Sequence, residues 1–140
     1  MTERNTPVVV CGVDGSDHAE TAVRVAAELS RARGARLALV AVNPLSPGAG
    51  HPDIPGWTDA EQDALLLAAA HDARRLGAEV QCVATRGRDP AEALIAAAVA
   101  LGADHIVVGT GDRKGVVNWL MGSVAKAVAA RAQVSVTIAR

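Results

Sequence analysis

The sequence contains few aromatic residues and almost no net charge. Among its 140 residues there is no Phe or Tyr, and there are only two Trp. The missing aromatic rings disfavour a flavodoxin-like electron carrier, which stacks its cofactor on such side chains. The formal net charge is −1, and charges of both signs are interspersed. We therefore expect the chain to bind neither nucleic acid nor an anionic membrane surface.

Cysteines and long apolar runs are also scarce. Cys11 and Cys82 both lie in apolar strand candidates, and we expect buried, reduced thiols. No CxxC pair or Cys/His cluster is present, which disfavours a zinc site. No apolar run approaches the ~20 residues that span a bilayer, and no secretion signal is recognisable. These absences predict a cytoplasmic protein without a membrane segment.

Common catalytic signatures are missing as well. The sequence has no Walker A motif and no GxSxG nucleophile elbow. Asp14 has no acidic neighbour and strand three ends in Thr85-Arg86, which disfavours a phospho-acceptor site of the response-regulator type. No general base is placed for phosphoryl transfer. We expect no enzymatic activity beyond, at most, slow ATP hydrolysis.

The sequence does contain a regular alternation of apolar strands and helices. Helical periodicity separates short β-branched runs at 8–13, 37–42, 80–85, 106–109 and 134–139. This alternation predicts an α/β fold with a parallel sheet covered by helices on both faces. Right-handed crossovers give a doubly wound, Rossmann-like, five-stranded parallel sheet of order 3-2-1-4-5. We expect residues 1–140 to form one domain.

Capping signals mark where the helices begin. Ser16 or Asp17 can cap the first helix, and residues 58–61 form a capping box for the second. The Asp89-Pro90 pair precedes the third helix, and Gly122-Ser123 opens the fourth. By contrast, residues 43–57 carry four prolines, three glycines and no periodicity. We interpret them as a long surface loop or lid.

A glycine-rich segment between the fourth strand and the last helix is the most informative part of the chain. It begins with Gly109-Thr110-Gly111 and ends at Gly122-Ser123, where a helix starts. Exposed backbone N–H groups and a helix N-terminus favour phosphate binding. An ordinary strand-to-helix turn would use the same glycines, so both interpretations stay open. In a doubly wound sheet this loop faces the turn that contains Asp14.

Together these segments resemble the universal stress protein family over essentially the whole chain. The resemblance rests on Val13-Asp14-Gly15-Ser16, Val42-Asn43-Pro44, Gly87-Arg88-Asp89-Pro90, residues 103–109 and Gly122-Ser123-Val124. The ATP-binding branch of this family, which has the adenine nucleotide α-hydrolase-like fold, carries the motif G-x2-G-x9-G-[ST]. Here the spacing from Gly109 to Gly122-Ser123 fits that motif without gaps, but Asp112 replaces its second glycine.

The resemblance implies an adenine-nucleotide site with ATP as its ligand. Gly12 and Val13 would line the base pocket, and Val42 would offer its backbone to the adenine. Asp14 would lie beside the ribose or a metal, or would only shape an Asx turn. Ser123 would donate its hydroxyl to phosphate, or would only cap the helix. The implied nucleotide-binding residues are Gly12, Val13, Asp14, Val42, Val108, Gly109, Thr110, Gly111, Gly122, Ser123 and Val124.

Asp112 opposes phosphate binding by its charge. At ~5 Å and an effective dielectric constant of ~20, its carboxylate would cost about 3 kcal/mol against one phosphate charge. That is roughly a hundredfold in affinity. Mg²⁺ bridging Asp112 or Asp14 to the phosphate, neutralisation by Arg113 or Lys114, or an outward side chain would remove this cost. Cyclic AMP, which has a single phosphate, would be repelled less than ATP.

The last strand, 134–139, has few charges and lies at an edge of the predicted sheet, where it is open to pairing. In the family the last strand forms an antiparallel dimer interface, which implies a homodimer. Our first hypothesis is a dimeric stress-response or regulatory module that binds an adenine nucleotide. A nucleotide-independent interaction protein of the same fold and a cyclic AMP binder remain as alternatives.

Overall fold

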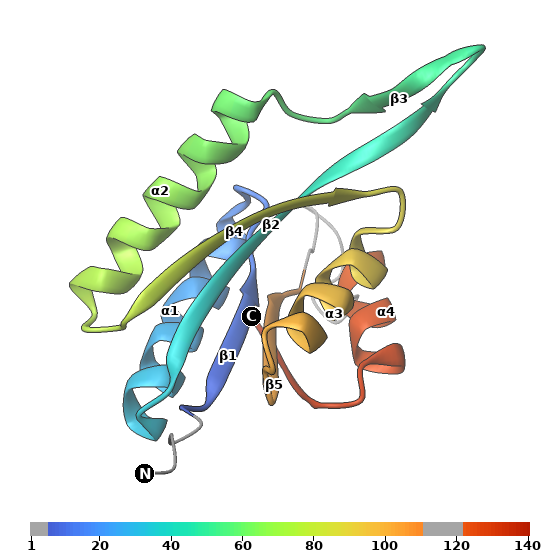
Figure 1. Cartoon of the computed structure of the whole chain (residues 1–140). Helices are drawn as coiled ribbons and strands as arrows, with labels where there is room; N and C mark the ends of the chain where they lie inside the picture. The colour runs from blue at the N-terminus through green and yellow to red at the C-terminus, as the bar shows by residue number, and fades with distance from the viewer. Residues whose placement is uncertain (1–5, 111–121) are drawn as a thin grey trace, which may run out of the picture.

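The computed structural model describes residues 6–110 and 122–140, in which strands and helices largely alternate (Figure 1). The strands are β1 (Val8–Gly12), β2 (Arg36–Gly48), β3 (His51–Pro55), β4 (Val80–Gly87), β5 (His105–Gly109) and β6 (Ser135–Ala139). The helices are α1 (Asp17–Arg33), α2 (Asp59–Arg75), α3 (Pro90–Ala100) and α4 (Ser123–Arg131).

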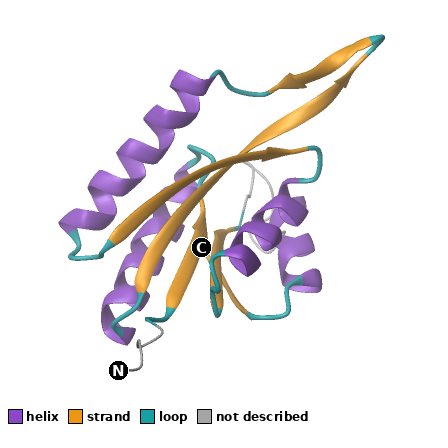
Figure 2. Ribbon diagram, in the orientation of Figure 1, coloured by secondary structure: helices purple, strands orange, loops and turns teal. Residues whose placement is uncertain are grey.

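Five of these strands form a parallel sheet in the order β4-β2-β1-β5-β6. At its centre Val10 of β1 lies beside Ala38 of β2 and Ile106 of β5. Helices α1 and α2 cover one face, and α3 and α4 cover the other (Figure 2). The predicted doubly wound α/β fold and its strand order are confirmed. The direction of winding reverses between β1 and β5, where a ligand cleft is expected.

The interpretation of residues 43–57 as a loop is wrong, because they contain strand β3 and the end of β2, and the described residues hold six strands. Strand β2 continues to Gly48 and pairs antiparallel with β3, Ser46 lying opposite Ile54. The resulting hairpin extends away from the rest of the molecule (Figure 1). The Asn43 side chain joins the two ends of this hairpin. Its Nδ2 donates to the Trp57 carbonyl at 2.9 Å, and its Oδ1 accepts from the Trp57 N–H at 3.0 Å. Proline and glycine hide the strand periodicity, so the sequence pattern shows no hairpin.

The core consists of aliphatic side chains that alternate between the two faces of the sheet. Val9 and Leu39 pack with α1 and α2, whereas Val10 and Val40 pack with α3 and α4. All four are fully buried. Small alanines on the helices allow close approach to the sheet, which explains how a core forms without Phe or Tyr.

The predicted helix starts are confirmed. The Ser16 hydroxyl accepts from the Ala19 N–H at 3.2 Å, so Ser16 rather than Asp17 caps α1. Thr58 and Glu61 form the reciprocal capping box of α2. Asp89 caps α3 by accepting from the Glu92 N–H at 3.1 Å.

The two cysteines have different environments. Cys11 is buried in β1, and this burial raises the pKa of its thiol to about 12. Cys82 is exposed, which contradicts the prediction of a buried thiol. The reason is topological, because β4 is an edge strand of the parallel sheet and its partner there is β2. A short apolar run does not distinguish an edge strand from a central one.

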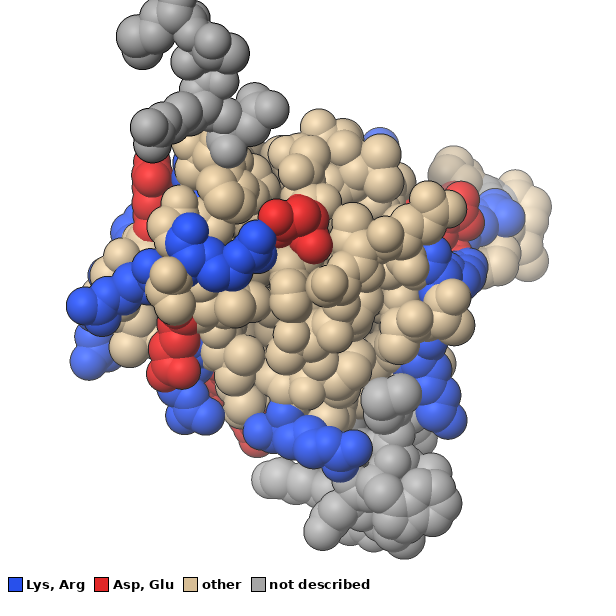
Figure 3. Space-filling model, turned by 90° about the horizontal axis from the view of Figure 1, so that it is seen from below, with Lys and Arg blue, Asp and Glu red and all other residues tan. Residues whose placement is uncertain are grey.

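Seen from below, the described surface carries both signs of charge (Figure 3). Lys and Arg side chains are spread around its margin with Asp and Glu among them, and uncharged residues occupy most of the centre. No helix within the described ranges is long and apolar enough to cross a membrane.

Candidate functional site

A cleft with a cavity of about 240 Å³ lies at the carboxyl ends of β1 and β5. Its floor includes Gly12 and Val13 from β1 and the turn after it, and Val108 and Gly109 from β5. Strand β2 adds Val40 and Val42. The remaining walls come from the turn before α1 and from the starts of α1, α3 and α4. This is the place at which open α/β sheets bind ligands.

A tight turn follows β1 and forms one wall of the cleft. Asp14 Oδ1 accepts hydrogen bonds from the Ser16 N–H at 2.9 Å and from the Ser16 hydroxyl at 2.6 Å. Asp14 therefore does shape an Asx turn. Gly15 has a φ of 80° in this turn, and a Cβ there would come within 2.5 Å of Leu65 Cδ2. Asp14 is exposed and lines the cleft, and Ser16 uses only its Oδ1, which leaves Oδ2 as a candidate ligand group.

Strand β2 extends past the end of β1 and presents its backbone to the cleft. The last β1–β2 pair is Gly12 with Val40, and the Val13 N–H donates to the Val40 carbonyl at 2.9 Å. Backbone groups alternate in direction along a strand, so those of Val42 face the same side as those of Val40. On that side the next bond runs from the Gly56 N–H to the Pro44 carbonyl at 2.8 Å. The N–H and C=O of Val42 therefore face the gap between β1 and β3.

The end of β5 is fixed to three other elements. Thr110 is 1% exposed, its N–H donates to the Ala139 carbonyl at 3.0 Å, and its carbonyl accepts from the Gly122 N–H. Its hydroxyl lies 3.2 Å from His18 Nδ1. At Gly109 a Cβ would come within 2.5 Å of the His18 carbonyl oxygen. Only glycine allows β5 to approach the start of α1 this closely.

Helix α4 begins at the cleft. Its N-cap is Gly122 and its first helical residue is Ser123, so the structure removes the alternative that Ser123 caps the helix. Among the described residues, no side-chain cap bonds the first turn. The N–H groups of that turn need partners, and the helix dipole favours an anion there.

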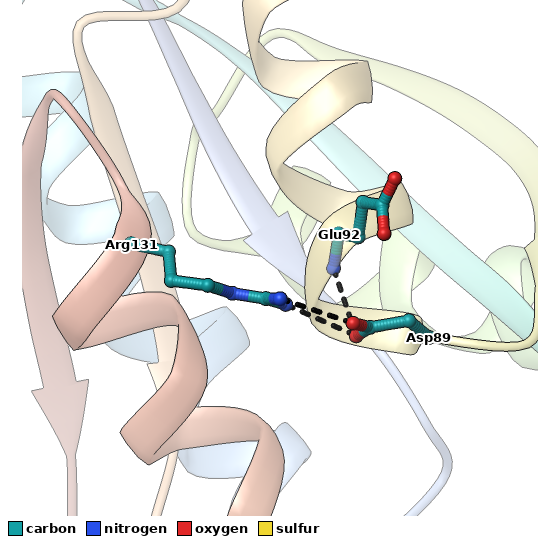
Figure 4. Close-up of polar contacts among 3 residues, drawn as sticks. All are labelled: Asp89, Glu92 and Arg131. Atoms are coloured by element: carbon teal, nitrogen blue, oxygen red, sulfur yellow. Dashed lines mark hydrogen bonds and ion pairs between the residues drawn. The ribbon is translucent and has the colours of Figure 1, made fainter.

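The start of α3 is braced against α4 (Figure 4). Asp89 caps α3 and also receives two hydrogen bonds from the Arg131 guanidinium, at 3.0 and 3.1 Å. The hydrogen bonds from Arg131 hold the pKa of Asp89 below its ordinary value. This contact ties α3, whose Pro90 and Leu94 line the cleft, to α4.

The cleft brings together most of the residues implied by the sequence resemblance. Those that line it are Gly12, Val13, Asp14, Val42, Val108, Gly109, Gly122, Ser123 and Val124. Thr110 is buried and is not among the residues that line the cleft. Gly111, Asp112, Arg113 and Lys114 lie outside the described residues. Within the described ranges no three His, Cys, Asp or Glu residues are grouped as metal ligands.

Sequence reasoning missed several other residues of the cleft. They are Ser16, His18, Ala19, Val40, Pro90, Leu94 and Ala125. A signal existed for His18, since a polar residue in the first turn of a helix after strand one must lie near the carboxyl edge of the sheet. No signal existed for Leu94, because an apolar residue in an alanine-rich helix is indistinguishable from the core.

Comparison with known proteins identifies the family. Residues 6–140 match the sequence model of the universal stress protein family. The chain belongs to this family. No curated protein matches it in sequence.

Solved universal stress proteins share the fold of this one over nearly the whole chain. A universal stress protein from Archaeoglobus fulgidus is 28% identical with a TM-score of 0.78, covering 98% of this chain and 100% of its own. A universal stress protein in complex with cAMP is 30% identical with a TM-score of 0.76, covering 96% and 97%. The Archaeoglobus fulgidus protein in complex with dAMP is 28% identical with a TM-score of 0.74, covering 97% and 98%.

Proposed function

We propose that this universal stress protein binds an adenine nucleotide in the cleft at the carboxyl ends of β1 and β5. The observation that carries this proposal is the position of Val42, whose N–H and C=O face the gap between β1 and β3. A neighbouring donor and acceptor on one backbone match the N1 acceptor and N6 donor of adenine. The same edge of guanine has the opposite polarity, so guanine would fit poorly.

ATP is the first ligand to test. Its phosphates would lie between Gly109 and the first turn of α4, where backbone N–H groups favour anions. Mg²⁺ usually binds through one or two carboxylates together with substrate phosphates. Asp14 Oδ2 is a carboxylate oxygen of this kind, since only Oδ1 is used by Ser16. Mg²⁺ held there would offset the charge of Asp112.

A nucleotide with a single phosphate is the second candidate. The relatives described above were solved with cAMP and with dAMP. Asp112 replaces the second glycine of the ATP motif and repels each additional phosphate charge. On this account, Asp112→Gly tightens ATP binding by about tenfold or more and changes cAMP binding less.

The nucleotide would act on a homodimer formed through β6. In the described sheet β6 is an edge strand that pairs with β5, and Val136 and Ile138 are only partly buried. Pairing two such edges around a two-fold axis would bury them. The dimer would present ligand-dependent surfaces to a partner, and any ATP hydrolysis would be slow.

Calorimetric titration of nucleotide-stripped protein tests the proposal. We expect micromolar binding of ATP, AMP or cAMP, with ATP requiring Mg²⁺. Asp14→Asn should weaken Mg-dependent ATP binding, whereas Asp63→Asn, on the exposed side of α2, should have no effect. Absence of heat with all three nucleotides would leave the nucleotide-independent interaction module as the better account.

A further inference from the structure

His18 lies in the cleft with one of its two ring nitrogens already engaged. It is the second residue of α1 and is half-buried in the cleft wall. Its Nδ1 is 3.2 Å from the Thr110 hydroxyl oxygen. In the described part of the chain, the hydrogen bonds of the imidazole involve Nδ1 alone.

The Thr110 hydroxyl is well placed to fix the imidazole. Thr110 is buried, and its backbone is bonded to Ala139 and Gly122. The backbone of His18 is in turn packed against Gly109, where a Cβ would not fit. Both partners of the His18–Thr110 bond are therefore held by elements that do not depend on a ligand. A side chain restrained in this way loses little entropy when it binds.

We infer that His18 is a phosphate-binding residue of the nucleotide site and donates from Nε2–H to a phosphate oxygen. When the Thr110 hydroxyl donates to Nδ1, the neutral ring carries its proton on Nε2. Nε2 is then a donor on a residue that lines the cleft and packs against Gly109. A bound phosphate would favour this tautomer, because in the other neutral tautomer Nε2 carries a lone pair that repels the anion. The inference rests on the proposed nucleotide function.

Two substitutions separate the two ring nitrogens. His18→Asn places an amide near the position of Nδ1 and keeps a partner for Thr110, but it removes the group at Nε2. His18→Gln places its amide near the position of Nε2 and keeps a donor for phosphate. His71→Asn, on the exposed side of α2, is the matched control.

The test measures AMP and adenosine affinities and thermal unfolding for all four proteins. We expect His18→Asn to weaken AMP binding by about tenfold while adenosine affinity and Tm stay at the wild-type values. His18→Gln should stay within about threefold of wild type for AMP. His71→Asn should match wild type throughout.

Three results would contradict the inference. Wild-type AMP affinity in His18→Asn would show that Nε2 makes no phosphate contact. Equal losses for AMP and adenosine in that variant would show a structural role only. Equal AMP losses in the Asn and Gln variants would refute the assignment to Nε2. If wild type binds neither AMP nor adenosine, the proposed function itself fails, which is a distinct outcome.

Discussion

The middle of the central strands and their carboxyl ends differ in the hydrogen-bond partners of their backbone N–H and C=O groups. In the middle, Val9, Leu39 and Val107 are fully buried, and the neighbouring strands supply the backbone partners. Past the carboxyl end of β1, the N–H and C=O of Val42 face a gap in the described sheet, and the Asn43 side chain bonds the backbone of Trp57. The same strand therefore supports folding in its middle and, under the proposed function, contacts the ligand at its end. Substitutions in the two regions should therefore affect unfolding and binding differently.

Leu39→Ala should have the largest effect on folding. Leu39 is fully buried between β1, β4 and the helices α1 and α2, so truncation leaves a cavity. We expect a loss of about 2–5 kcal/mol in the free energy of unfolding by urea denaturation. Leu67→Ala is the control, because Leu67 is 67% exposed and should change stability by less than about 0.5 kcal/mol. Similar losses in both variants would contradict the assigned core.

Gly109→Ala should affect folding and binding together. A Cβ at this position would come within 2.5 Å of the His18 carbonyl oxygen and 2.7 Å of its carbonyl carbon. Backbone must shift to relieve that contact, at a cost of about 1–3 kcal/mol, and the shift would displace His18 and weaken nucleotide binding. At Gly87 a Cβ would lie 3.2 Å from the Ala93 Cβ and 3.7 Å from the Asp89 carbonyl oxygen, so Gly87→Ala should be milder in both assays. Wild-type behaviour of Gly109→Ala would refute the close approach.

Asn43→Ala should loosen the β2–β3 hairpin. The variant leaves the N–H and C=O of Trp57 without their side-chain partner, at an expected cost of about 1–2 kcal/mol. Faster hydrogen exchange at Trp57 and Gly56 would identify the hairpin as the affected region. Asn43→Asp retains the acceptor for the Trp57 N–H and should be intermediate. Unchanged exchange in the Ala variant would contradict this role of Asn43.

Lowering the pH should have the smallest effect on stability, through the ion pair between Asp53 and Arg88. Hydrogen bonds from Arg88 lower the pKa of Asp53 below its ordinary value of 3.8. A carboxyl with a lowered folded-state pKa contributes stability above its unfolded pKa, and loses it as pH falls through the folded-state value. We expect Tm to decline as pH falls below about 4, less steeply for Asp53→Asn and less steeply in high salt. Identical pH profiles for wild type and Asp53→Asn would show that the pair contributes nothing.

The parts of the fold that could be predicted are those with a strong local signal. β-branched runs such as 37–42 and the caps Ser16, Thr58 and Asp89 predicted the strands, helices and sheet order. The hairpin could not be predicted, because a side-chain amide and backbone bonds hold it, not an apolar pattern. The exposure of Cys82 depends on strand neighbours that are far away in the sequence.

The candidate site was predictable where a backbone feature marks it. Gly109, Gly122 and Asp14 stand at strand or helix ends, and the topology brings such ends together. Val42 was predicted as a site residue only through the family resemblance. The structure explains its role, because β1 ends before it and leaves its backbone facing a gap. The pairing of His18 with Thr110 joins residues 92 positions apart, which no local pattern reveals.

On the proposed function, the Val42 backbone at the carboxyl edge of the sheet binds adenine, and the middle of each strand makes no contact with the ligand. An NMR titration of ¹⁵N-labelled, nucleotide-stripped protein with AMP and with GMP tests it most directly. We expect large AMP-dependent shifts of the Val42, Gly12 and Ser123 amides, small shifts at Leu37 and Ile106, and no saturable shifts with GMP. Equal responses to AMP and GMP, or shifts that leave the Val42 amide unchanged, would contradict it.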